Sequence, residues 1–103
     1  MSWLRTWLAG SALPPQRGPV AAGMARVWMM NDDTTPMEFV VGVLEAELGL
    51  SRSAATLIMF QVHREGAASC GDFALDEAQG RVDRILETAR LRGHPLQCKL
   101  EKE

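Results

Sequence analysis

Apolar and polar positions divide the first part of the folded region into a strand and a helix. Residues 25–31, ARVWMMN, form a short apolar run that predicts a β-strand. The polar stretch that follows predicts a helix start, with Thr35 as N-cap, Pro36 in the first turn and Glu38 completing a capping box. Gly49 is expected to end this helix. Its apolar stripe consists of Met37, Val40, Val41, Leu44 and Leu48.

Four further elements complete the pattern. Ser51 is placed to cap a second helix that extends to Gly66, and residues 67–73 are a plausible second strand. Residues 75–91 predict a third helix, and the alternation in residues 95–103 is typical of an exposed edge strand. The order is therefore β-α-α-β-α-β. We expect an α+β fold in which a three-stranded antiparallel sheet packs against three helices.

Length and composition limit the chain to one small domain. Residues 1–25 are rich in proline and glycine and show no sustained period, so they predict a flexible N-terminal extension. Residues 26–103 are then the folded domain. A chain of 103 residues is near the size at which a single core suffices.

Charge and cysteine usage exclude several partners. The chain has 11 Lys and Arg against 13 Asp and Glu, a net charge of -2, and no basic run that could follow a phosphate backbone. We therefore expect no nucleic acid partner. No apolar stretch approaches the roughly 20 residues that span a bilayer. Cys70 and Cys98 match no zinc spacing and are too few for a secreted disulfide scaffold, so we expect a cytoplasmic protein without metal or cofactor.

The end of the first strand carries the candidate chemistry. Asn31 and Asp33 are two residues apart, so their side chains can point to one side while Asp32 points elsewhere. Asn-Asp-Asp before a helix is also ordinary turn chemistry. The pattern alone therefore leaves both interpretations open.

The second helix supplies a matching face. Met59, Val62 and His63 lie at i, i+3 and i+4 and share one side of the helix. If that side contacts the strand end, Asn31, Asp33 and His63 form a cluster of acceptors beside an apolar patch. Such a cluster fits an ammonium group next to a hydrophobic side chain. The alternative is that His63 is simply a surface or core residue.

An enzyme is the weakest interpretation of the same residues. His63 could act as a base with Asp33 as its partner, but the sequence places no serine or cysteine nucleophile beside them. It also contains no phosphate-binding loop and no set of metal ligands. We therefore expect a binding protein without catalytic activity.

Four segments resemble one known family. NDDTTPMEFVVGVL, IMFQVHREG, CGDF and HPLQCKLEKE are similar to the Clp protease adaptor family ClpS, and the resemblance covers residues 26–103. The resemblance implies an adaptor that binds the first residue of a substrate protein when it is Leu, Phe, Tyr or Trp. It also implies delivery of that protein to the N-terminal domain of the ClpA unfoldase of the ClpAP protease, by a monomeric adaptor.

The resemblance also assigns roles to particular residues. It implies that Asn31, Asp33 and His63 hold the substrate's free α-amino group. Met37 matches the family's gate residue, which disfavours β-branched first residues. Asp76 and Arg81 match an acid and a base of the ClpA-docking surface. The side-chain pocket is expected to be lined by Met29, Met30, Thr35, Met37, Val40, Met59, Val62 and Leu96.

Some positions depart from the family pattern. Met29 and Met30 stand where relatives usually carry branched aliphatic residues, and Thr34 stands in place of a common aromatic residue. These changes leave open the preference among first residues and whether this is a primary or a second ClpS. The fold also resembles the C-terminal domain of the ribosomal stalk protein, so the alternative is a non-catalytic interaction domain without N-terminal-residue specificity.

Overall fold

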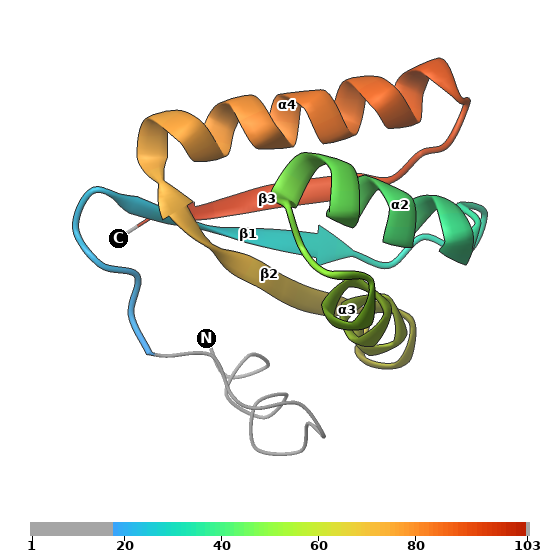
Figure 1. The fold of residues 1–103 in the computed structure, drawn as a ribbon, viewed down its shortest axis with the longest axis horizontal. Coiled ribbons are helices and arrows are strands. Elements are labelled where there is room, and N and C mark those ends of the chain that lie inside the picture. Colours follow the sequence, from blue (N-terminus) through green and yellow to red (C-terminus); the bar gives the residue numbers. More distant parts are fainter. Residues whose placement is uncertain (1–17, 103) are drawn as a thin grey trace.

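The computed structural model describes residues 18–102, which form a three-stranded sheet and three helices. Figure 1 shows how the helices pack against the sheet. Most of the expected N-terminal extension therefore lies outside the described residues. The order of elements confirms the predicted α+β fold. The elements are β1 (Met24–Met30), α2 (Met37–Leu48), α3 (Arg52–Glu65), β2 (Ala67–Ala74), α4 (Leu75–Leu91) and β3 (Gln97–Lys102).

β1 is the central strand of the sheet. The strand order is β2-β1-β3, and both neighbours pair with β1 in the antiparallel sense. β3 is thus an edge strand, as its alternating sequence predicts. Because β1 is central, its C-terminal end is held on both sides: Met30 pairs with Ala67 of β2 and with Gln97 of β3. The polar residues after Met30 therefore start from a fixed position.

The helices cover the sheet and enclose the core. α4 packs across all three strands, α2 packs against α3 and α4, and α3 packs against β2. On α4 the buried residues recur at spacings of three and four, as the sequence predicts; they are Ala78, Val82, Ile85 and Ala89. Full burial of a side chain such as Ile85 or Leu44 stabilises the fold by about 1.5–3 kcal/mol. This packing fixes where α2 and α3 stand relative to the end of β1.

The predicted capping box at the start of α2 is wrong. The helix begins at Met37 with Pro36 at the N-cap position, and no side chain caps its amide groups. Thr35 instead donates its hydroxyl to the carboxylate of Asp32. A charged carboxylate three residues away is a stronger partner for this hydroxyl than a neutral backbone amide, because charge-assisted hydrogen bonds are the stronger class. The cap predicted for α3 is confirmed, since Ser51 accepts from the Ala54 amide at 3.1 Å.

The start of β1 is anchored by a partly buried ion pair between Arg26 and Asp72. Arg26 is only 3% exposed, and its guanidinium donates to Asp72 of β2 at 2.7 Å and to the carbonyl of Gly18 at 2.9 Å. Trp28, on the same side of the strand, donates its indole N–H to Glu101 of β3 at 2.9 Å. These bonds link β1 to both neighbours.

Within residues 18–102, no helix is both long and apolar enough to cross a membrane.

Candidate functional site

A cavity of about 270 Å³ lies at the C-terminal end of β1, between the loop that follows this strand and helices α2 and α3. Its lining combines carboxylate, amide and imidazole groups with apolar side chains. The lining residues are Met30, Asn31, Asp32, Asp33, Thr35, Pro36, Met37, Val40, Met59, Val62, His63 and Leu96. Residues distant in the sequence therefore meet around one hollow.

The polar side of the cavity begins at the first residue after β1. The amide nitrogen of the Asn31 side chain donates to Asp33 Oδ1 at 3.0 Å. The backbone N–H of Asn31 donates to the carbonyl of Gly66 at 2.9 Å, which ties this loop to the end of α3. Both Asn31 and Asp33 are exposed, so their acceptor oxygens are accessible to a ligand. The prediction that these two side chains point to the same side is supported by this contact.

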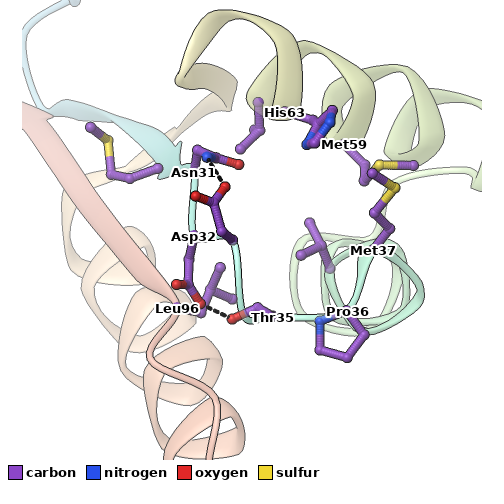
Figure 2. Close-up of a pocket in the computed structure, with 12 residues that line it drawn as sticks. Asn31, Asp32, Thr35, Pro36, Met37, Met59, His63 and Leu96 are labelled. Atoms are coloured by element: carbon purple, nitrogen blue, oxygen red, sulfur yellow. Dashed lines mark hydrogen bonds between the residues drawn. The ribbon is translucent and has the colours of Figure 1, made fainter.

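α3 brings His63 to the same cavity. Met59, Val62 and His63 all line it, as expected for positions i, i+3 and i+4 on one helical face. Gly66 ends α3 with a positive φ of 91°, a conformation that favours glycine, and its carbonyl is the acceptor for Asn31. The turn at Gly66 therefore fixes the helix that carries His63 against the loop that carries Asn31. Figure 2 shows the side chains of Asn31 and His63 at the border of the same hollow.

The remaining walls are apolar. Val40 of α2, Val62 of α3 and Leu96 before β3 are buried, while Met37 is 43% exposed. Figure 2 shows Met37 and Met59 on the side of the hollow opposite Asn31 and Asp32. Met37 is thus a flexible, partly exposed side chain at the border of an otherwise buried apolar wall.

Two results differ from the expected lining. Met29 is fully buried and packs in the core, so it does not line the cavity. The reason is enclosure: the Met29 side chain is completely surrounded by the core cluster, whereas its neighbour Met30 is only partly buried and lines the cavity. Asp32 and Pro36 line the cavity although sequence reasoning did not select them. The available signal in the sequence was the pair of hydroxyl residues after Asp32, which can donate hydrogen bonds to its carboxylate.

Asp32 is surrounded by hydrogen-bond donors. Its carboxylate accepts from the Thr34 amide at 3.4 Å, from the Thr34 hydroxyl at 3.2 Å and from the Thr35 hydroxyl. The bond from Thr35 is the largest cause that lowers the pKa of Asp32 below its ordinary value, because donors stabilise the ionised carboxylate. Asp32 therefore stays charged while contacting its own loop.

Asp76 and Arg81 lie at the start of α4 and do not line the cavity. Asp76 accepts from the Glu77 amide at 2.9 Å. Arg81 donates to Glu77 at 2.9 Å and to the carbonyl of Glu47 at 2.7 Å, and its guanidinium lies 4.8 Å from the centre of the Phe73 ring. Arg81 therefore has an intramolecular role in connecting α4 to α2.

Both cysteines are buried thiols. Burial raises the pKa of Cys70 far above its ordinary value and raises the pKa of Cys98 to about 12, so both stay protonated at neutral pH. Among residues 18–102, no three His, Cys, Asp or Glu side chains come together in a way that could hold a metal ion.

The fold and the cavity define a small α+β binding protein with a pocket that is acidic at one end and apolar at the other. The chain belongs to the ClpS family: residues 21–99 match the family described as ATP-dependent Clp protease adaptor protein ClpS. The matched range includes both the loop that carries Asn31 and Asp33 and the helix that carries His63.

Relatives extend over most of the chain. It is 49% identical over 80 residues to the ATP-dependent Clp protease adapter protein ClpS of Gluconobacter oxydans, covering 78% of this chain and 67% of the relative. It is 45% identical over 98 residues to ClpS of Rhodospirillum centenum, covering 95% and 88%. ClpS 1 of Agrobacterium fabrum is 46% identical over 78 residues, covering 76% and 67%.

A solved structure has the same fold. ClpS2 of Agrobacterium tumefaciens, described as bound to L-phenylalaninamide, superposes with a TM-score of 0.76 at 30% identity and covers 81% of this chain and 100% of its own. Its ligand carries a free α-amino group and a bulky aromatic side chain. The relatives are named as adapters of the Clp protease, the same description that the matching family carries.

Proposed function

We propose that this protein binds the free α-amino group and the bulky hydrophobic side chain of substrate N-termini beginning with Leu, Phe, Tyr or Trp. In this proposal it delivers those substrates to the ClpA unfoldase of the ClpAP protease. The observation that carries the proposal is the lining of the 270 Å³ cavity, where Asn31, Asp33 and His63 border an apolar wall. That combination fits a cation joined to an apolar side chain.

The size of the cavity supports a single side chain as its occupant. Its volume is slightly below the roughly 300–1,000 Å³ of pockets that enclose whole drug-sized molecules. Met59, Val62 and Leu96 supply buried apolar contacts. Burying a Leu or Phe side chain contributes about 1.5–3 kcal/mol. Met37 at the border is proposed to act as the gate that disfavours β-branched first residues.

The polar end supplies selectivity for a chain terminus. An α-amino group has a pKa of about 7.7–8.0 and is mostly cationic at neutral pH, whereas an internal peptide bond carries no charge. A hydrogen bond between that cation and the Asp33 carboxylate contributes about 1.5–3 kcal/mol. The carbonyl oxygen of Asn31 and a ring nitrogen of His63 can accept hydrogen bonds from the other ammonium N–H groups. After the cost of association, micromolar affinity is a reasonable result.

Delivery requires a second surface. Asp76 and Arg81 are the proposed docking residues for the N-terminal domain of ClpA, and they lie on α4 away from the cavity. This separation supports simultaneous binding of a substrate terminus and of ClpA. The proposal needs only one copy of the adaptor for each substrate.

A fluorescence titration tests the function directly. Labelled peptides that differ only in the first residue are added to the protein: Leu, Phe, Val, and Leu with an acetylated amine. Leu and Phe peptides are expected to bind, the Val peptide weakly, and the acetylated peptide not at all. Equal binding of acetylated and free Leu peptides would contradict recognition of the amine. Adding the ClpA N-terminal domain to the same sample should increase the anisotropy further.

A further inference from the structure

The two adjacent acids after β1 have different surroundings. Asp33 is exposed and contacts only the Asn31 side chain among the hydrogen bonds of this loop. The carboxylate of Asp32 accepts from the backbone and the hydroxyl of Thr34 and from the hydroxyl of Thr35. The Asp32 carbonyl also accepts from the Thr35 amide at 3.4 Å. Two neighbouring carboxylates that repel each other are therefore accommodated because one of them is surrounded by donors.

We propose that Asp32 is a positioning residue, which holds residues 31–36 in the one conformation that presents the amine acceptors and the side-chain wall together. This inference rests on the proposed function, since it concerns how that pocket is assembled. In it Asp33 faces the ligand's cation, while Asp32 organises the loop. The two acids thus have separate roles.

Thr35 is the link between the two halves of the pocket. It is 8% exposed and lines the cavity, yet its hydroxyl is used by Asp32 and caps no helix. The next residue, Pro36, accepts from the amides of Phe39 and Val40 and so begins α2. A bond between Asp32 and Thr35 therefore connects the loop carrying Asn31 and Asp33 to the helix carrying Met37 and Val40.

The rest of the loop has few other restraints. Upstream, Asn31 is tied to Gly66 through its backbone amide. Downstream, apart from the bond between the Thr35 amide and the Asp32 carbonyl, the next backbone hydrogen bonds are those that the Pro36 carbonyl accepts from α2. Loss of the Asp32 carboxylate leaves the largely buried Thr35 hydroxyl without its acceptor, and a buried hydroxyl without a partner is unfavourable. The loop would then relax, and a ligand would have to restore its order on binding.

Thr34 adds to the same network. Its hydroxyl lies 3.2 and 3.3 Å from the two carboxylate oxygens of Asp32, and its backbone amide donates as well. Thr34 does not line the cavity, so its only described contribution to the pocket is through Asp32. Replacing this hydroxyl therefore tests the positioning role without altering any surface that a ligand would contact.

A double-mutant cycle tests the proposal. The dissociation constant of a peptide with a free N-terminal Leu is measured for wild type, Asp32→Ala, Thr35→Val and the double variant. Each single change is expected to weaken binding about tenfold. The double variant should bind about as tightly as the single variant with the lower affinity, because the two substitutions remove the same hydrogen bond. Thr35→Ser retains the hydroxyl and should restore most of the affinity. Thr34→Ala should weaken binding about twofold to threefold.

The control and the opposing outcomes are distinct. Asp83→Ala removes an exposed acid on α4 and should leave the affinity unchanged. Thermal unfolding of each variant confirms that binding is measured on folded protein, and Thr34→Ala, an exposed substitution, remains informative should Asp32→Ala fail to fold. Wild-type affinity in the Asp32 or Thr34 variants, or fully additive losses in the cycle, would overturn the positioning role. Failure of wild type to bind the free peptide would instead overturn the proposed function.

Discussion

Asn31 and Asp33 are joined by a hydrogen bond of 3.0 Å across the residue that separates them in the sequence. The bond uses the side-chain amide nitrogen of Asn31, so the carbonyl oxygen of the same amide is left to accept. It also fixes the Asp33 carboxylate beside that oxygen. Two acceptors are therefore held next to each other before any cation arrives, which reduces the ordering cost of binding.

Removing the charge of Asp33 should weaken amine recognition. Asp33→Asn keeps the shape of the side chain but loses the charge-assisted bond, so the affinity for a free Leu peptide should fall about tenfold to a hundredfold. Isothermal titration calorimetry at pH 7 measures the change. Glu38→Gln is the matched control, since Glu38 is a nearby acid that does not line the cavity. An unchanged affinity in Asp33→Asn would remove Asp33 from the site.

Shortening Met37 should change which first residues bind. Met37 is 43% exposed and lines the cavity border, so Met37→Ala opens space there without removing core packing. Peptides beginning with Val or Ile should then bind more tightly relative to a Leu peptide than they do in wild type. Competition against one labelled Leu peptide gives the ratios. Met37→Leu keeps the bulk and should retain the wild-type order; the same ratios in all three proteins would exclude a gate.

The fold was largely predictable because its signals are local. The spacing of apolar residues on α4 and the alternation of β3 are properties of a few consecutive residues, and both elements form as predicted. The face shared by Met59 and His63 follows from the period of a helix in the same way. What brings this face to the end of β1 is the turn at Gly66, whose carbonyl bonds to Asn31.

Two details that were predicted incorrectly, the helix cap and one residue of the pocket lining, depend on tertiary contacts that the local pattern does not show. A threonine before a proline is a common N-cap, but here the Thr35 hydroxyl donates to the Asp32 carboxylate and does not cap α2. Met29 and Met30 are chemically identical, but Met29 is fully enclosed by the core while Met30 is partly buried and lines the cavity. Which group binds the Thr35 hydroxyl and which methionine lines the cavity depend on individual tertiary contacts. The pattern of apolar and polar residues does not encode these contacts.

Arg81 should matter for stability as well as for any partner. Its side chain is 25% exposed, donates to the Glu47 carbonyl at 2.7 Å and lies over Phe73. Arg81→Ala should lower the free energy of unfolding by about 1–2 kcal/mol, since it removes a charged hydrogen bond and a cation–π contact. Urea denaturation measures this loss. Arg84→Ala, a more exposed arginine one turn away, should cost less.

A binding experiment with ClpA must account for that loss. Asp76→Asn removes charge at the start of α4 while leaving an oxygen that can accept from the Glu77 amide. It is therefore the cleaner test of docking. Weaker ClpA binding with unchanged urea denaturation would support the proposed surface, and unchanged binding would argue against Asp76 as part of it.

The two cysteines should resist modification in the folded protein. Burial keeps both thiols protonated, with the pKa of Cys98 raised to about 12, and a protonated thiol is a poor nucleophile. Labelling with a thiol reagent at pH 8 should be slow and should become rapid for both cysteines in denaturant. Rapid labelling of even one thiol without denaturant would show that this part of the sheet opens readily.

The charge of Asp32 gives its hydrogen bonds a defined pH range. Its folded-state pKa lies below the ordinary value of 3.8, so the stabilisation it provides is complete above that value and is lost as the pH falls through the lower folded pKa. Melting temperatures of wild type and Asp32→Asn should therefore differ by a constant amount from pH 7 down to about pH 4. The difference should shrink below that range, while Asp83→Asn serves as the exposed control. A difference that vanishes already at pH 6, or that persists unchanged at pH 2, would show that the contacts with Thr34 and Thr35 do not depend on an ionised carboxylate.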